Sequence, residues 1–150
     1  PRTFSVVARW LQRAHPIGGS LDRNTKVLLV EDEPGIQAVV QQALEDAGFE
    51  ALAVASGEEA IELLRRTIAG VGGLVTDIRL SGAMDGWEVA HFARRLAPTM
   101  PVIYVTGADA RVWPSEGVPD SLMFMKPFDP DQIAFALQRL LKKSRGDAAW

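Results

Sequence analysis

The sequence predicts an α/β fold, a doubly wound five-stranded parallel sheet with five helices, and two observations predict it. Five short apolar runs alternate with segments whose apolar residues recur at helical spacing. This alternation is typical of parallel strands joined by right-handed helical crossovers. Most of the apolar runs also end at a polar or charged residue, and in a parallel sheet such residues meet at one edge, where ligands bind.

The order of the elements follows from the apolar spacing and from the turn residues between the apolar runs. Strands are expected at residues 26–30, 50–55, 74–77, 101–105 and 122–125. Helices are expected at about 36–48, 57–68 and 86–96, within 107–121, and at 130–143. Strand and helix therefore alternate along the whole central part of the chain.

Local sequence signals set several of these boundaries. Ser56, with Glu59 three positions later, has the pattern of a capping box, which opens a helix. The run GVGG (70–73) is expected to end that helix before the third strand begins near Leu74. Two prolines and a glycine fall within residues 114–119, so we expect the fourth helix to be short or distorted.

The length of 150 residues is most economically one domain, large enough to bury a core. We assign this domain to residues 26–143. Residues 1–25 form an N-terminal extension or linker whose apolar spacing allows a short amphipathic helix, and residues 144–150 form a C-terminal tail. The role of the extension cannot be read from its sequence.

The composition excludes several classes of function. A net charge of −3 argues against nucleic-acid binding, which needs a clustered basic face. The chain has no cysteine, so disulfides, thiolate catalysis and cysteine-ligated zinc are excluded. No apolar stretch approaches the roughly 18 residues that a membrane span requires, and we expect a cytoplasmic protein that binds no membrane.

Five polar residues at the ends of the predicted strands form a candidate site. Glu31 and Asp32 close the first apolar run, Asp77 the third, Thr106 the fourth and Lys126 the fifth. Three crowded carboxylates repel one another unless a hard cation accepts their oxygens, which favours Mg²⁺. A hydroxyl and an ammonium beside that ion can bind phosphoryl oxygens, so the site suits phosphoryl transfer with Asp77 as the nucleophile.

At this point the chain resembles a known family, the receiver domain of two-component response regulators, a phosphoacceptor domain like the chemotaxis regulator. Four matching stretches carry the resemblance: VLLVEDEP (27–34), LVTDIRLSGAMDGWEVA (74–90), PVIYVTG (101–107) and FMKPFDPDQI (124–133). Each motif alone is weak, but their order and separation are specific. The resemblance implies a flavodoxin-like sheet with the strand order 2-1-3-4-5.

The resemblance also implies roles for the acidic residues. Asp77 would be the phosphorylated residue. Asp32 would bind Mg²⁺ directly and Glu31 through water, while the backbone carbonyl of Arg79 would complete the protein ligands together with Asp77. The side chain of Arg79 would not be a ligand.

Further residues would form the switch of such a domain. Thr106 would move toward the phosphoryl group, and Gly107 would leave room for the phosphoryl donor. Lys126 would bind the phosphoryl group, with its peptide bond to Pro127 commonly cis in the family. Met123 stands where the family commonly has an aromatic residue that turns inward, and methionine gives a less distinct two-state geometry.

The function that the resemblance implies is a phosphoacceptor switch, regulated by a histidine kinase or a histidine phosphotransfer protein and acting on an unknown downstream protein. A phosphatase of the haloacid dehalogenase type is an alternative. Such enzymes have a second acidic residue two positions after the nucleophile, where this chain has Arg79, and this argues against the alternative. A second alternative is a protein-binding module that works without phosphorylation. The sequence leaves open the identity of the partners, whether the chain forms a homodimer, and whether it stands alone or was cut from a longer chain.

Overall fold

The strands of the chain form a single parallel sheet. The computed structural model describes residues 25–67, 70–107 and 110–144. Within them the five strands lie in the order β2-β1-β3-β4-β5, all in parallel pairs. The strands are β1 (Lys26–Val30), β2 (Glu50–Val54), β3 (Val71–Asp77), β4 (Val102–Thr106) and β5 (Leu122–Met125). The predicted fold class and strand order are confirmed, whereas the expected N-terminal helix lies outside the described residues.

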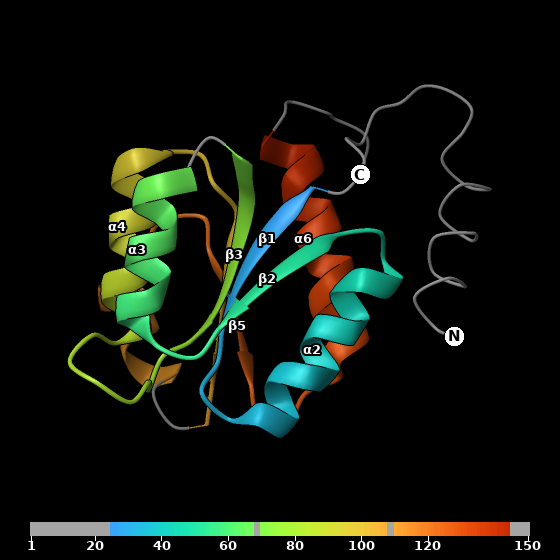
Figure 1. Ribbon diagram of the computed structural model, residues 1–150, viewed down its shortest axis with the longest axis horizontal. Helices are drawn as coiled ribbons and strands as arrows, with labels where there is room; N and C mark the ends of the chain where they lie inside the picture. The colour runs from blue at the N-terminus through green and yellow to red at the C-terminus, as the bar shows by residue number, and fades with distance from the viewer. Residues whose placement is uncertain (1–24, 68–69, 108–109, 145–150) are drawn as a thin grey trace.

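Helices cover both faces of the sheet. They are α2 (Pro34–Asp46), α3 (Gly57–Thr67), α4 (Gly86–Leu96), α5 (Trp113–Glu116) and α6 (Pro130–Ser144). Figure 1 shows α3 and α4 on one face and α2 and α6 on the other. A 3₁₀ turn, η2 (Ala110–Val112), precedes the four-residue α5. The expectation of a short fourth helix is confirmed.

The central strands are buried on both faces, which explains their continuous apolar sequences. In β1, Leu28 and Val30 pack into the core beneath α3 and α4, while Val27 and Leu29 pack into the core beneath α2 and α6. All four side chains are at most 1% exposed. With both layers filled, the polar residues that follow the strands are held at the carboxyl edge of a rigid scaffold.

The third strand begins earlier than the sequence predicts. GVGG was expected to separate helix and strand, but β3 starts at Val71 and includes Gly72 and Gly73. A Cβ at Gly73 would lie 3.2 Å from Leu137 of α6, and one at Gly72 would lie 2.7 Å from Thr25. At these glycines other elements approach the strand closely. Close approach, like a bulge or a bend, is a common reason for glycine within a strand.

The start of α3 has the predicted cap in a modified form. The hydroxyl of Ser56 accepts a hydrogen bond from the backbone N–H of Glu59 at 3.1 Å. The carboxylate of Glu59 accepts in return from the N–H of Ala55 at 3.3 Å, one residue before the expected donor. The standard box forms instead at α4, where Asp85 and Glu88 bond each other's backbone N–H groups at 3.0 Å.

Candidate functional site

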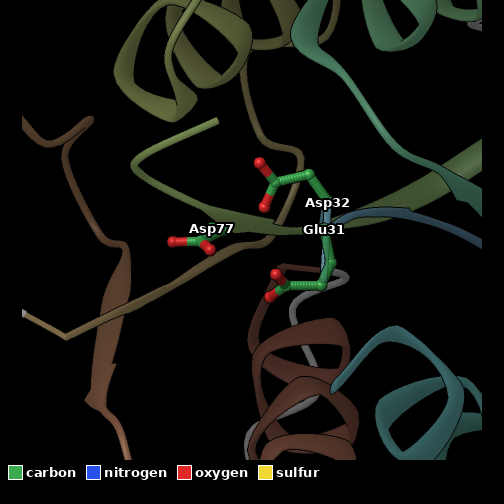
Figure 2. A group of neighbouring side chains, drawn as sticks. All are labelled: Glu31, Asp32 and Asp77. Atoms are coloured by element: carbon green, nitrogen blue, oxygen red, sulfur yellow. The ribbon is translucent and has the colours of Figure 1, made fainter. Parts of the chain in front are cut away.

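The register of the sheet brings the predicted site residues to one edge. Val30 at the end of β1 lies beside Thr76 of β3, so Glu31 and Asp32 emerge next to Asp77. Carboxylate oxygens of these three residues all lie within 4.8 Å of one another. Figure 2 shows the three groups turned to the same side, with that of Asp77 between the other two in the view. The convergence predicted from the strand ends is therefore present in the structure.

Lys126 supplies the positive charge of this group. Its Nζ lies 2.9 Å from Oδ2 of Asp77 and 3.6 Å from Oε1 of Glu31. Burial lowers the pKa of Lys126, but the hydrogen bond to Asp77 and the surrounding negative charge outweigh this effect, so its pKa is raised overall. The backbone N–H of Lys126 donates to the carbonyl of Thr106 at 2.8 Å, and the bond to Pro127 is cis. The ammonium therefore remains charged and is aimed at Asp77.

Glu31 is a buried carboxylate with unmet bonding capacity. It is 1% exposed, and its Oε2 accepts a hydrogen bond from the N–H of Glu33 at 3.1 Å. Its Oε1 is the one buried side-chain oxygen or nitrogen in the described residues that has no hydrogen-bond partner. Burial raises the pKa of Glu31 to about 7, and the negative charge of Asp77 adds to this, although the N–H of Glu33 and Lys126 act in the opposite direction.

The buried Glu31 oxygen that has no hydrogen-bond partner is one sign that this site suits a cation. The ammonium of Lys126 pairs with three carboxylates, those of Glu31, Glu33 and Asp77, and a fourth, that of Asp32, lies within 4.8 Å of the Glu31 and Asp77 oxygens. An all-oxygen set of crowded carboxylates is the donor set that a hard divalent cation prefers. A bound cation would also neutralise the charge that raises the pKa of Glu31. The residues present therefore fit Mg²⁺.

Asp32 connects this group to the loop after Asp77. Its Oδ2 accepts a hydrogen bond from the backbone N–H of Ser81 at 3.0 Å. This bond joins the end of β1 to the loop Ile78–Asp85, which also contains the predicted carbonyl ligand, Arg79. The side chain of Arg79 is exposed. Asp32 is thus placed both to meet a cation and to fix the loop beside it.

The other predicted residues lie at or near the same edge. Thr106 is 1% exposed at the end of β4. A Cβ at Gly107 would meet no described atom within 4 Å, so this position faces open space. Met123 does not reach the edge: it is half-buried against the core beneath α3 and α4, while Phe124 packs on the opposite side of β5. The role of Met123 in the switch therefore stays a prediction, and its side chain packs against the core.

The sequence did not identify two residues of the site, Glu33 and Gly86. Glu33 approaches the Nζ of Lys126 at 3.4 Å and makes it a shared partner of three carboxylates. Gly86 packs against the backbone of Asp77, where a Cβ would lie 2.1 Å from the carbonyl oxygen. Three consecutive acidic residues, 31–33, were a usable signal for Glu33. Gly86 was read only as the start of a helix, and its close contact depends on the tertiary fold.

Comparisons with known proteins agree with this geometry. The family profile described as "Response regulator receiver domain" matches residues 27–138. The receiver protein of Sinorhizobium medicae is 42% identical, with a TM-score of 0.78 over 83% of this chain and 99% of that one. The C4-dicarboxylate transport transcriptional regulatory protein DctD of Rhizobium meliloti is 32% identical over 79% of this chain and 26% of its own length.

A third relative bears on the metal. The receiver domain of the sensor histidine kinase PA1611 of Pseudomonas aeruginosa, solved with a magnesium ion coordinated in its active-site cleft, is 25% identical. Its TM-score is 0.67 over 79% of this chain and 98% of that one. The chain spans between 26% and 54% of the length of the curated relatives that it matches.

These matches do not favour a phosphatase of the haloacid dehalogenase type. None of the helices in the described ranges has the length and apolar character that a membrane span needs. The profile covers most of the chain, and the sheet order and acidic edge are those expected from it. The chain therefore belongs to the receiver-domain family of two-component response regulators.

Proposed function

We propose that Asp77 accepts a phosphoryl group from a histidine kinase or a histidine phosphotransfer protein, with Mg²⁺ as cofactor. One observation carries the proposal: the Asp77 carboxylate lies within 4.8 Å of those of Glu31 and Asp32 and 2.9 Å from the ammonium of Lys126, at the carboxyl edge of the sheet. Asp77 is 4% exposed, and the loop after it leaves its carboxylate at the rim of the site. A nucleophile, a cationic partner and a cation site therefore meet at one point.

In the transfer step, a carboxylate oxygen of Asp77 attacks the phosphorus of the phosphohistidine. The new P–O bond forms as the P–N bond breaks, and the electron pair of that bond returns to the imidazole nitrogen. The product is an acyl phosphate on Asp77 and a free histidine on the donor. This chain supplies the positioning and charge stabilisation, as expected where phosphoryl transfer depends on geometry and electrostatics.

The residues around Asp77 have separate tasks in this step. Lys126 exchanges its bond to the Asp77 carboxylate for one to a phosphoryl oxygen, and the hydroxyl of Thr106 donates to another. The open space at Gly107 admits the donor. Asp32 and Asp77, the carbonyl of Arg79 and, through water, Glu31 would hold Mg²⁺, which neutralises charge on the transferring group.

The consequence of phosphorylation is a changed affinity for a downstream protein that is still to be identified. The chemistry requires no further enzyme, so both phosphorylation and the later hydrolysis of the acyl phosphate are properties of the domain itself. We propose a cytoplasmic location, and a homodimer is compatible with the proposal without being required by it. The complete acidic set supports this function over that of a phosphorylation-independent binding module.

Phosphorylation of defined variants tests the proposal. Incubation with acetyl phosphate and Mg²⁺ should add one phosphoryl group to the chain, measured by intact mass. The substitution Asp77→Asn should abolish the addition, whereas Asp46→Asn, at the end of α2 and outside the site, should leave it unchanged. A phosphoryl group found on another residue of the Asp77→Asn protein would show that the acceptor is misassigned.

A further inference from the structure

The loop Ile78–Asp85 carries the predicted carbonyl ligand and has its apolar anchors at its start. Ile78 is buried and Leu80 packs half-buried against the core beneath α3 and α4, whereas residues 81–83 are exposed. The loop is closed at its base by the N–H of Gly86, which donates to the carbonyl of Ile78 at 2.8 Å. Its exposed middle, residues 81–83, is therefore positioned by polar contacts to neighbouring elements, and these contacts constrain the backbone that directly follows Arg79 and Leu80.

One such contact comes from α3, outside the site described above. Glu58 lies in the first turn of α3, and its Oε2 accepts a hydrogen bond from the backbone N–H of Ala83 at 2.9 Å. The two residues are 25 positions apart in the chain. Hydrogen bonds from the backbone N–H of Glu58 itself, then from that of Ala83, lower the pKa of Glu58. The side chain is thus an ionised acceptor that ties the loop to the helix.

Two glycines make this contact possible. Gly82 has φ +98°, and a Cβ there would lie 2.8 Å from Oε1 of Glu58. Gly57 begins α3, and a Cβ there would lie 2.7 Å from the Cβ of Met84. A Cβ at Gly57 would push the helix and the loop apart, whereas one at Gly82 would displace the Glu58 carboxylate, and the positive φ at Gly82 adds backbone strain for any other residue. The close fit of the loop against α3 is therefore specified from both sides.

The contact at Glu58 is adjacent to the contact at Asp32. Asp32 holds the N–H of Ser81, and Glu58 holds the N–H of Ala83, two residues further along the same exposed backbone. A shift of the loop would therefore change both the orientation of Asp32 and the position of the Arg79 carbonyl. Groups that orient metal ligands from outside the ligand set commonly change metal affinity when they are removed.

We propose that Glu58 is a positioning residue for the metal site: by holding the loop Ile78–Asp85 against α3, it sets the affinity for Mg²⁺. It acts through the backbone of Ser81 and Ala83 and does not touch the ion. This inference rests on the proposed function, because it assumes that Asp32 and the Arg79 carbonyl bind Mg²⁺. It adds α3 to the elements that control the site.

The test compares Glu58→Ala and Glu58→Gln with Glu62→Ala in the full chain. Glu62 lies one turn later on α3, where its side chain is 61% exposed and its carboxylate pairs with Arg66. Titration calorimetry with Mg²⁺ should give a dissociation constant raised about tenfold in Glu58→Ala, the lower end of the range for groups that support metal ligands. Glu62→Ala should match the wild-type protein. Glu58→Gln keeps a carbonyl acceptor for Ala83 and should recover most of the affinity.

Hydrogen exchange in the absence of metal gives an independent readout. The amides of Ser81 and Ala83 should exchange faster in Glu58→Ala than in Glu62→Ala, while amides of β3 should remain unchanged. Equal Mg²⁺ affinity in Glu58→Ala and Glu62→Ala, or equal exchange at residues 81–83, would overturn the inference. If the wild-type protein does not bind Mg²⁺, or if Asp32→Asn binds it normally, the metal site itself is wrong, and the two failures are thereby distinguished.

Discussion

Replacing Glu31 by glutamine should stabilise the metal-free protein at pH 8 and leave its stability at pH 5 nearly unchanged. Glu31 is 1% exposed, and its Oε1 has no hydrogen-bond donor among the described residues. The neighbouring carboxylate of Asp77 is also an acceptor, and the ammonium of Lys126, 3.6 Å away, is too distant to donate a hydrogen bond, so that oxygen needs a proton or a bound metal ion. Glutamine has nearly the same shape and offers N–H groups at this position without a charge.

The size of the effect follows from the pKa of Glu31. Burial raises that pKa from 4.5 to about 7, a difference of 7 − 4.5, or about 2.5 units. One unit corresponds to about 1.4 kcal/mol, so ionising Glu31 in the folded protein costs on the order of 3 kcal/mol. Because the pKa is higher in the folded state, the folded protein binds more protons between pH 4.5 and 7. The free energy of unfolding therefore falls as the pH rises through this window and is level above it.

Urea unfolding in the presence of a chelator measures this dependence. The wild-type protein should lose about 3 kcal/mol of unfolding free energy between pH 5 and pH 8 through this group, whereas Glu31→Gln should lack that loss. Glu62→Gln, which changes an exposed carboxylate, should behave like the wild-type protein. Added Mg²⁺ should stabilise the wild-type protein at pH 8 more than Glu31→Gln. An identical pH dependence for Glu31→Gln and wild type would refute the reasoning.

Three further outcomes follow from the packing. Tyr104→Phe removes the hydroxyl that accepts from the N–H of Val118 at 3.1 Å; this should cost about 1–3 kcal/mol in urea unfolding and speed amide exchange at Val118. Leu137→Ala opens a cavity beneath α6 and should cost about 2–5 kcal/mol by the same measurement. Gly86→Ala places a Cβ against the carbonyl of Asp77, so thermal stability and Mg²⁺ affinity should fall together; an unchanged affinity would contradict that contact.

The sequence was sufficient for the arrangement of the fold and for the core of the candidate site. Parallel strands that are buried on both faces have continuous apolar sequences, so their ends are easy to locate, and the polar residues after those ends must share an edge. Asp77 and Lys126 are 49 positions apart, yet this rule places both at one edge, and the strand order that the resemblance implies puts their strands on either side of β4. The roles of these residues in phosphoryl transfer remain predictions.

What the sequence could not supply depends on distances between elements. GVGG was read as a break because glycine is a local breaker signal, whereas Gly73 is small to admit Leu137 of α6. The bond between Glu58 and Ala83 has no sequence pattern, because its partners lie in a helix and in an irregular loop. Contacts such as these two depend on how helices and loops pack against the sheet. They can be identified only from the tertiary structure.

An aromatic residue lies near the predicted switch residues Thr106 and Met123, but it comes from β4. Tyr104 lies two positions before Thr106, on the same face of β4, and is fully buried. Its ring packs against Trp87 with centroids 4.7 Å apart, and its hydroxyl is bonded to the N–H of Val118. Met123 lies beside Tyr104 in register on β5, and both belong to the core beneath α3 and α4. Because the hydroxyl of Tyr104 accepts from the N–H of Val118, we expect a displacement of β4 at Thr106 to alter the segment after α5 without requiring an inward rotation of residue 123.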